Sequence, residues 1–375
     1  RAVNQDPFQE YMRDSEPDKR KKGYAWRTGI GLQAVDGLKT SDYLLHTAVR
    51  NIEGEITFQE ANALLQSYYE AHPSSDFEDR TEEADKVSVR IAELLSEKAF
   101  GFTPQEYISI HRKLFAGIYS HAGRLRDYNI TKPEWVLDGA SVLYGSATEL
   151  RATLDYDFSE ERNFSYKGLS MDEMIHHLAV FLSRLWQIHI FGEGNTRVTA
   201  VFFIKYLRSL GFEATNDVFA ENAWYFRNAL VRANYNDLKK GIHETTAFLE
   251  LFLRNLLLNE HHPLRNRTLH IAWRPDEAIK PDIETEKPDI GKTKPDIGAA
   301  KPDIMAEFLP KTAGNIRKLR EAFPEGAVFG RTEVMKVLGL KTSGASELLM
   351  KLQKSGIVEA VSGQGKGKYR FILFS

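Results

Sequence analysis

Residues 189–197 read HIFGEGNTR and crowd a histidine, a carboxylate, two glycines, an asparagine and an arginine into nine positions. Residues 170–188, just before it, place apolar side chains at helical spacing behind a capping-box pattern. Residues 197–210, just after it, are apolar nearly all round and are followed by Gly211, a suitable end for a helix. The sequence therefore predicts a loop that joins two helices of a buried core.

Helical periodicity recurs through the first 260 residues. We expect further helices at 41–52, 57–71, 80–98, 104–115, 220–233 and 243–258. The exception is residues 134–147, EWVLDGASVLYGSA, where two β-prone runs flank Asp138-Gly139 and predict a β-hairpin. A lone hairpin leaves its strand edges open to pairing with another chain. The predicted fold class is therefore mainly α, with one hairpin in this part.

Composition is typical of a globular protein. The chain has 375 residues, 42% hydrophobic and 27% charged, which suffices for one large core and a smaller one. Its 50 basic and 52 acidic residues leave no global field that would attract nucleic acid or an anionic membrane. The absence of cysteine excludes disulfides, thiolate nucleophiles and cysteine-ligated zinc. No apolar run approaches the roughly 20 residues of a spanning helix and no signal peptide opens the chain, so we expect a cytoplasmic protein without a membrane partner.

A repeated tetrapeptide marks the clearest boundary. KPDI recurs with a strict period of seven, at Lys280, Lys287, Lys294 and Lys301. A proline in every repeat removes a helical hydrogen-bond donor, which excludes a heptad coiled coil. We expect an extended spacer of polyproline character. The alternative is a docking peptide in which each isoleucine is an anchor.

Residues 312–375 differ in pattern from the rest. Three short helical patterns are followed by GIVEAVSGQGKGKYRFILF, two β-prone runs around a turn rich in glycine and lysine. This order predicts a winged helix, a small α+β domain. Such domains bind DNA, but they also serve as docking and dimerisation units, so DNA and a homodimer both remain open as partners. The basic residues at the wing tip are Lys366, Lys368 and Arg370.

The 189–197 loop carries groups suited to a phosphorylated ligand. Gly192 and Gly194 let backbone amides approach an anion at the positive end of the following helix. Arg197 can contact phosphate oxygens in bidentate fashion, and Glu193 is a hard oxygen ligand for Mg²⁺. His189 is the one nearby group whose ordinary pKa permits proton abstraction near neutral pH. We therefore expect an anion site with a base and a metal ligand beside it.

Extended to HIFGEGNTRVTA, the loop resembles the signature of the Fic family: His, Pro, Phe, two variable positions, Gly, Asn, Gly, Arg, two variable positions, Arg. The likeness extends through most of residues 24–260. HAGRLRDYNI at 121–130 resembles the stretch that precedes the family's hairpin, and residues 134–147 resemble its target-docking flap. The resemblance implies a Fic-type helical bundle with a β-hairpin flap. It also implies transfer of AMP from ATP to a hydroxyl side chain of a protein.

The resemblance assigns roles by position. His189 would be the base that deprotonates the target hydroxyl, Glu193 would hold Mg²⁺ against the α- and β-phosphates, and Arg197 would bind a β-phosphate. The remaining phosphate contacts are expected from Gly192, Gly194, Asn195 and Thr196. Nucleotide-base contacts are expected from Tyr225 and Asn228, although Tyr225 fits a core aromatic equally well. The docking residues of the flap are expected to be Val136, Leu137, Val142 and Leu143.

Three positions depart from the signature. Ile190 replaces proline and Thr196 replaces glycine, and both are substitutions that we expect the family to tolerate. Ala200 stands where a second arginine is usual, and that arginine is expected to contact the γ-phosphate and to pair with an inhibitory glutamate. The Doc toxins, a Fic branch that phosphorylates its target, also lack it. They carry alanine and lysine at the positions of Gly194 and Thr196, so this loop is closer to the nucleotide-transferring type.

Residues 31–54 resemble the antitoxin module that inhibits Fic proteins. Its motif is Ser or Thr, three variable residues, Glu and Gly. Asp36-Gly37 matches the end of the motif with an acid one methylene shorter, and Glu53-Gly54 is a rival match. We prefer Asp36. Because residue 200 is alanine, we expect the acid not to form the usual salt bridge, and autoinhibition to be weakened or altered.

These observations divide the chain into four parts: an antitoxin-like helical region at 1–75, a catalytic domain at 76–262, a linker at 263–307 and a winged helix at 308–375. The predicted function is that of a protein adenylyltransferase that uses ATP and Mg²⁺ and acts on a Ser, Thr or Tyr hydroxyl of a target protein. Two alternatives remain. One is a Doc-like protein phosphotransferase, and the other is a winged-helix transcriptional regulator whose Fic domain senses nucleotide.

Overall fold

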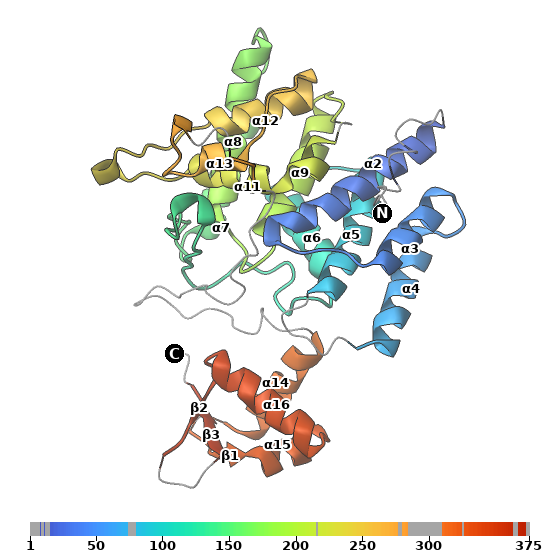
Figure 1. Ribbon diagram of the computed structural model, residues 1–375, viewed down its shortest axis with the longest axis vertical. Coiled ribbons are helices and arrows are strands. Elements are labelled where there is room, and N and C mark those ends of the chain that lie inside the picture. The colour runs from blue at the N-terminus through green and yellow to red at the C-terminus, as the bar shows by residue number, and fades with distance from the viewer. Residues whose placement is uncertain are drawn as a thin grey trace.

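The computed structural model describes residues 8, 11, 16–73, 80–214, 217–276, 280–283, 310–324, 326–362 and 367–372. Within these ranges the chain is mainly helical, with a small sheet in its C-terminal part (Figure 1). The predicted fold class is therefore confirmed. Buried apolar side chains of the described residues form two clusters, one within residues 8–269 and the other within residues 316–371.

Helices enclose the first cluster. The helices that carry most of the packing are α2 (Pro17–Gly31), α3 (Asp42–Ile52), α4 (Phe58–Ala71), α5 (Thr81–Ser96), α6 (Pro104–Phe115), α7 (Leu150–Asn163), α8 (Met171–Ile188), α9 (Asn195–Ser209), α11 (Ala223–Arg232) and α12 (Ala247–Leu258). Shorter elements are the 3₁₀ helices η1 (Leu32–Asp36), η2 (Trp135–Leu137) and η3 (Leu238–Lys240) and the helices α10 (Val218–Glu221) and α13 (Asn266–Leu269). All eight helices expected from periodicity are present, and α2 and α7 were not foreseen.

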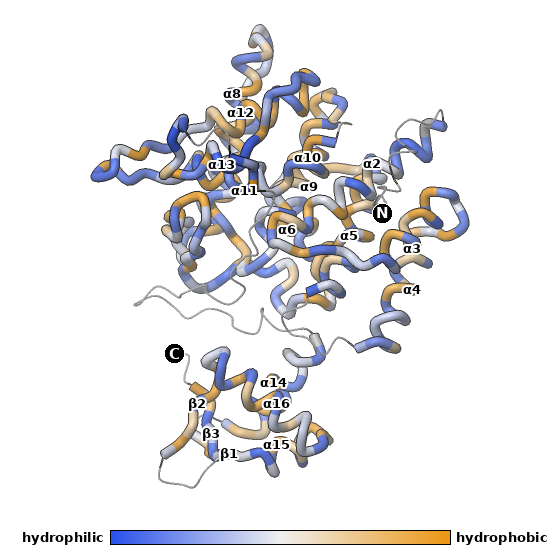
Figure 2. The backbone as a smooth tube through the Cα atoms, in the orientation of Figure 1, coloured by the Kyte–Doolittle hydropathy of each residue, from blue (hydrophilic) through white to orange (hydrophobic). Residues whose placement is uncertain are grey.

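The helix starts follow from local capping chemistry. At α4, the Thr57 hydroxyl accepts from the backbone amide of Glu60 at 3.1 Å, and the Glu60 carboxylate accepts in return from the Thr57 amide. At α8, the Ser170 hydroxyl accepts from the Glu173 amide at 3.2 Å. Figure 2 shows hydrophobic and hydrophilic residues alternating along these helices, as amphipathic helices require.

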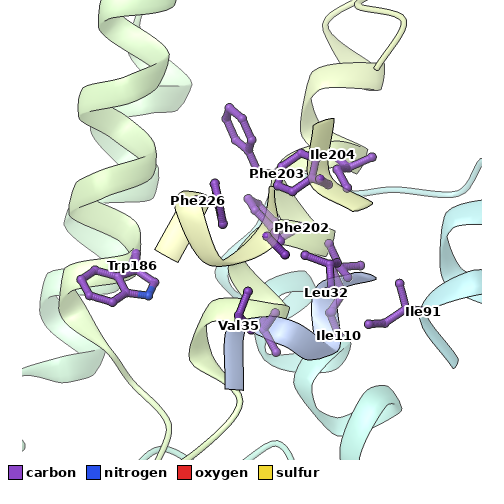
Figure 3. Packing of buried hydrophobic residues seen from close by; sticks show 14 of the residues in the cluster. Leu32, Val35, Ile91, Ile110, Trp186, Phe202, Phe203, Ile204 and Phe226 are labelled. Carbon is purple, nitrogen blue, oxygen red and sulfur yellow. The ribbon is translucent and has the colours of Figure 1, made fainter. Parts of the chain in front are cut away.

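Helix α9 is the centre of the larger core. Its residues 195–207 are all buried, and it packs against α5, α6, α8 and η1. In Figure 3 the side chains of Phe202 and Phe203 lie among residues of other elements, including Leu32 and Val35 of η1. The N-terminal end of this rigid helix carries the signature residues, so the core fixes the position of the site.

The predicted hairpin at residues 134–147 is wrong in its strands and right in its turn. Asp138 and Gly139 have φ of 53° and 89°, and the Ala140 amide donates to the Leu137 carbonyl at 3.2 Å, as in a type I′ turn. The flanking runs form η2 and irregular chain in this fully described segment. Their apolar side chains are used in packing instead of in strand pairing, since Val136, Leu137 and Val142 are all buried.

The C-terminal part consists of α14 (Pro310–Ala322), β1 (Phe329–Gly330), α15 (Arg331–Leu338), α16 (Thr342–Lys354), β2 (Val358–Ala360) and β3 (Lys368–Phe371). The strands pair antiparallel in the order β1-β3-β2, with Val358 opposite Phe371 and Phe329 opposite Tyr369. The three expected helices and two expected strands are present, and β1 completes the sheet.

The basic residues of the expected wing are engaged with acids where the structure describes them. Lys368 lies 3.2 Å from Glu333, and Arg370 lies 2.6 Å from Glu359. Lys366 lies outside the described residues. The winged-helix assignment and its DNA partner remain predictions. Across the described ranges, no helix combines the length and apolar character that crossing a membrane requires.

Candidate active site

The loop between α8 and α9 is held in an unusual backbone conformation at both ends. His189 follows the last residue of α8 with φ 53° and ψ 55°, in the left-handed region that non-glycine residues seldom adopt. Gly194 precedes α9 with φ 82°, and an added Cβ there would lie 2.4 Å from the Phe115 ring. A Cβ on Gly192 would lie 2.4 Å from the Tyr128 hydroxyl. Both glycines are therefore required by packing, in addition to any approach of a ligand.

The imidazole of His189 is fixed in one tautomer. Its Nδ1 lies 3.1 Å from the carbonyl oxygen of Trp186, which can only accept, so Nδ1 carries the proton. Nε2 then holds a lone pair, and this buried atom has no hydrogen-bond partner. The ring stacks on Tyr144 with a centroid distance of 4.0 Å. Burial lowers the pKa of His189 well below its ordinary value, and the charge of Lys132 lowers it further. His189 is therefore neutral and presents a base at Nε2.

Arg126 clamps the backbone on which His189 sits. Its guanidinium donates to the carbonyl oxygens of His189 at 2.6 Å, Ile188 at 3.1 Å and Gly145 at 2.5 Å. Its own amide donates to the Ile190 carbonyl at 2.9 Å. One buried side chain thus joins the end of α8 to the segment 134–147. Arg126 lies within the stretch 121–130 that resembles the family, but it was not predicted as a site residue.

Two further side chains brace the loop from inside. The Asn195 amide donates to the Phe191 carbonyl at 2.7 Å and its oxygen accepts from the Phe191 amide at 3.0 Å. His111 accepts from the Gly123 amide and donates to the Glu193 carbonyl, each at 2.9 Å. The Asn195 side chain, expected to contact phosphate, is therefore occupied by the loop itself. Thr196 is similar, because its hydroxyl accepts from the indole N–H of Trp186 at 3.0 Å.

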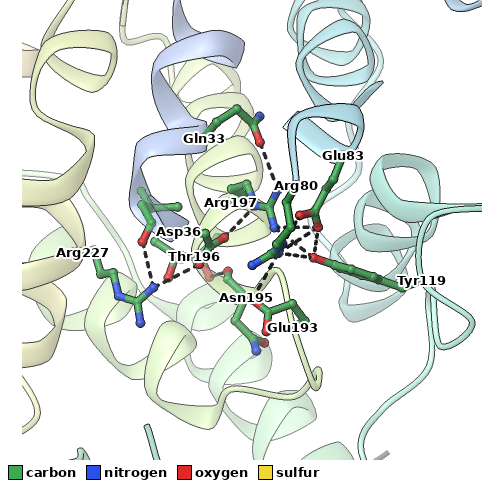
Figure 4. Close-up of polar contacts among 12 residues, drawn as sticks. Gln33, Asp36, Arg80, Glu83, Tyr119, Glu193, Asn195, Thr196, Arg197 and Arg227 are labelled. Atoms are coloured by element: carbon green, nitrogen blue, oxygen red, sulfur yellow. Dashed lines mark hydrogen bonds and ion pairs between the residues drawn. The ribbon is translucent and has the colours of Figure 1, made fainter. Parts of the chain in front are cut away.

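Arg197 is fully buried within a group of polar side chains from several elements (Figure 4). Its Nη1 donates to Gln33 Oε1 at 3.0 Å and its Nη2 to Glu83 Oε1 at 3.4 Å. The guanidinium also lies over the Phe115 ring, 4.8 Å from the centroid. We call Arg197 with Gln33, Asp36, Glu83 and Tyr119 the Arg197 cluster. Within it, the groups that would bind phosphate are already partnered by protein.

Asp36 takes part in this cluster. Because residue 200 is alanine, the acid does not form the usual salt bridge, and it pairs with two other arginines instead. Asp36 Oδ2 lies 2.9 Å from Arg197 Nε, as an ion pair without hydrogen-bond geometry, and Asp36 Oδ1 lies 3.1 Å from Arg227 Nη1. Burial acts to raise the pKa of Asp36, but the charges of Arg197 and Arg227 lower it to about 2. The acid is thus ionised and engages the first arginine of the signature.

Glu53, the rival acid, lies elsewhere. Its side chain is exposed, accepts from the Tyr11 hydroxyl at 2.5 Å and lies 2.9 Å from the Lys19 ammonium. The structure therefore brings Asp36, and not Glu53, to the signature arginine.

A family model described as Fic/DOC family matches residues 101–207, a range that contains His111, Arg126 and the whole 189–197 loop. The chain carries a Fic/DOC family domain. The crystal structure of a Fic family protein from Desulfovibrio desulfuricans G20 is similar with a TM-score of 0.43 and 13% identity, over 95% of this chain and 88% of that chain. No curated protein matches the chain.

Glu193 is the carboxylate that the sequence predicts as a metal ligand. Glu193 is 28% exposed on its side chain and lies 3.9 Å from Arg80. Burial acts to raise the pKa of Glu193, but the charges of Lys132 and Arg80 bring it below its ordinary value, so the oxygens are free of protons. No cluster of three or more potential ligands occurs among the described residues. Mg²⁺ commonly binds through one or two carboxylates together with substrate phosphates, and the ionised Glu193 carboxylate is compatible with that mode.

Tyr225 and Asn228, from which nucleotide-base contacts were expected, form hydrogen bonds within the protein. The Tyr225 hydroxyl donates to the Phe248 carbonyl at 2.9 Å, and Asn228 donates to Asn266 Oδ1 at 3.0 Å. Both are buried, and Tyr225 is a core aromatic. Their neighbour Arg227 reaches the site instead, donating to Asp36 and, at 2.8 Å, to Glu134. The sequence offered no signal for this, because the two acids lie 191 and 93 positions away.

Only one of the expected docking residues of the flap is exposed. Leu143 is 85% exposed, and its carbonyl accepts from the Gln187 side chain at 2.6 Å. The Gly145 amide donates to the Gln187 carbonyl at 3.3 Å. This stretch of the flap therefore runs beside the end of α8 and next to His189. Leu143 is the apolar side chain that another protein could contact there.

Substituting Arg126 with lysine should disturb the Fic site through geometry. Lysine keeps the charge but cannot reach the carbonyls of His189, Ile188 and Gly145 together. We expect a loss of about 2 kcal/mol or more in the free energy of unfolding and a fall of about a hundredfold in any activity that uses His189. Urea unfolding and steady-state rates measure the two effects. The matched control is Arg124→Lys, at an exposed arginine of the same segment, and equal effects in both variants would contradict the role given to Arg126.

The stability of the Fic core should fall as the solution is acidified. Burial lowers the pKa of both His111 and His189 well below the ordinary value near 6.5. Below that pH the unfolded chain binds protons that the folded chain does not, so the free energy of unfolding decreases by about 1.4 kcal/mol per pH unit for each histidine. Urea titrations at several pH values measure this slope. Asparagine tolerates the left-handed backbone at position 189, so the His189→Asn variant should show a slope smaller by the contribution of one histidine. An unchanged slope would contradict the lowered pKa of His189.

Proposed function

We propose that the protein transfers AMP from Mg–ATP to a hydroxyl side chain of a target protein. The observation that carries the proposal is the buried, unpartnered Nε2 of His189, held as a proton acceptor at the end of α8 beside Glu193 and the N-terminus of α9. A neutral histidine with a free lone pair is suited to general-base chemistry near neutral pH. The first amides of α9 lack intrahelical acceptors and favour a negatively charged ligand.

The proposed reaction is a single displacement at the α-phosphorus of ATP. The proton of the target hydroxyl passes to Nε2 of His189, and the oxygen forms a bond to the α-phosphorus of ATP. The bond from that phosphorus to the oxygen bridging the β-phosphate breaks, so that pyrophosphate leaves and AMP remains on the target. Mg²⁺, when bound, would offset the phosphate charge, and Glu193 is the residue that would hold it. Arg197 would contact the β-phosphate once freed from its protein partners.

The arrangement of Arg197 supports an inhibited ground state. The guanidinium is paired with Asp36, Glu83 and Gln33, and His189 is 2% exposed beneath Tyr144. ATP phosphates and a target hydroxyl would both have to displace protein groups. We therefore propose that Asp36 inhibits through Arg197, the first arginine of the signature, in place of the absent second one. Autoinhibition would then be retained, with Arg197 as the partner of the inhibitory acid.

Labelled ATP separates this proposal from the two alternatives. Label from the α-phosphate should appear on protein, and label from the γ-phosphate should not. The reverse pattern would establish Doc-like phosphorylation. A nucleotide-sensing DNA regulator would show neither, together with DNA binding that persists in His189→Asn and requires Lys366 and Lys368. In the structure, Lys368 is paired with Glu333 and Arg370 with Glu359.

A further inference from the structure

The first KPDI repeat is bound to the helical core. All four of its residues, Lys280 to Ile283, contact the segment Arg265–Arg267, which we call the 265–267 site. Asn266, at the centre of this site, is 6% exposed, and its side-chain oxygen accepts from Asn228 of α11 at 3.0 Å. The site is therefore anchored in the core of the Fic part of the chain and is not a feature of the linker alone.

The 265–267 site forms hydrogen bonds with both the backbone and one side chain of the repeat. The Asp282 carboxylate accepts from the backbone amides of Asn266 at 3.0 Å and Arg267 at 2.9 Å. The Asn266 side chain donates to the Ile283 carbonyl at 2.9 Å. The arginine side chains donate to the two preceding carbonyls, with Arg265 contacting Lys280 at 2.5 Å and Arg267 contacting Pro281.

This contact set explains the composition of the repeat. Asp supplies two charge-assisted hydrogen bonds, which no neutral side chain can match. Pro fixes its own φ and restricts the residue before it to extended backbone, and it leaves no amide that needs a partner. The isoleucine is half-buried. The repeat is thus held through the Asp282 carboxylate and its own backbone carbonyls, with the isoleucine side chain partly buried beside them.

We propose that the 265–267 site is a receptor for the KPDI motif and that the four repeats of the same chain compete for it. The repeats begin 14, 21, 28 and 35 residues after Asn266, and each contains the same four residues. Loop closure costs grow only as the logarithm of loop length, so the last repeat binds only about fourfold less well than the first on entropic grounds. This inference does not depend on the proposed enzymatic function.

Exchange between repeats would set how many residues separate the bound repeat from helix α14. With the first repeat bound, residues 284–309 separate it from α14, which begins at Pro310. With the fourth repeat bound, only residues 305–309 remain. The reach of the C-terminal part thus changes in steps of seven residues without any change in either folded part.

Hydrogen exchange of the full-length chain tests the proposal at the backbone amides of Asn266 and Arg267. Asp282→Asn should reduce their protection only about twofold, because three repeats remain at comparable closure cost. In the quadruple variant, asparagine replaces Asp282, Asp289, Asp296 and Asp303. The protection of the two amides should then fall about ten- to a hundredfold. Glu286→Gln, a charge change between repeats, is the matched control and should leave protection unchanged. If these amides were as unprotected in the single Asp282→Asn variant as in the quadruple variant, the proposal would be overturned.

The second experiment adds a peptide that contains one KPDI motif to the quadruple variant. The peptide should restore protection, whereas the same peptide with asparagine in place of aspartate should not. Failure of the KPDI peptide to restore protection would overturn recognition of the motif. Protection of Asp282→Asn that falls on dilution of the protein would show that a second copy supplies the motif, which would overturn exchange within one chain.

Discussion

Replacing His189 with asparagine is expected to reduce transfer of label from α-labelled ATP by about a hundred- to ten-thousandfold. Asparagine keeps the left-handed backbone of the site and a donor for the Trp186 carbonyl, but its amide cannot accept the proton of a hydroxyl nucleophile. Because Nε2 of His189 has no other partner, no hydrogen bond is lost at that atom. Single-turnover rates on automodification or on a purified target measure the effect.

The matched control for this variant is His176→Asn. His176 lies on the same helix, is 62% exposed on its side chain and contacts Glu250, away from the loop. Its substitution should leave the rate unchanged. A His189→Asn protein that folds normally and transfers label at the wild-type rate would remove His189 from the chemistry.

Replacing Asp36 with asparagine is expected to raise the rate of label transfer about 5- to 150-fold, the range of ordinary allosteric coupling energies. The variant keeps the size of the side chain and removes the charge that pairs with Arg197 and Arg227. Both arginines retain an acid, Glu83 for Arg197 and Glu134 for Arg227, so the fold should survive the loss. Automodification with α-labelled ATP measures the change, and thermal unfolding checks the fold.

Glu53→Gln is the matched control, since Glu53 is the other acid that precedes a glycine at a motif-like position. Its carboxylate pairs with Lys19 on an exposed face, and we expect no change in rate. Activation by Glu53→Gln together with an unchanged Asp36→Asn would place the inhibitory contact elsewhere.

Much of the fold follows from local sequence rules. Helix α6 begins at Pro104 and ends at Phe115, the predicted bounds, because Thr103 caps it and proline is favoured at its first position. Helix α2 was not predicted from periodicity, and its sequence contains three glycines, a residue type that disfavours helix interiors. An added Cβ at Gly31 would lie 2.6 Å from the backbone of Ala220, and at Gly29 2.8 Å from the Ser88 carbonyl. These glycines permit close helix packing, which no local pattern reports.

The candidate site, like the fold, could be predicted from the sequence only in part. The order of residues along the 189–197 loop led to the predicted roles of His189, Glu193 and Arg197. The partners that hold them were not predictable, because they come from distant segments: Gln33 lies 164 positions from Arg197, and Arg126 lies 63 positions from His189. For Asp36, the comparison of single positions indicated only that the usual partner is missing, and it could not foresee that the acid would pair with Arg197 itself.

The central claim is that His189 serves transfer of AMP under the restraint of Asp36. Intact-mass spectrometry of the Asp36→Asn protein, incubated with Mg–ATP and a candidate target or a lysate, tests it most directly. We predict a mass increment of one AMP on protein, absent when His189→Asn is added to the same chain. An increment of one phosphate, or an AMP increment that persists without His189, would contradict the account.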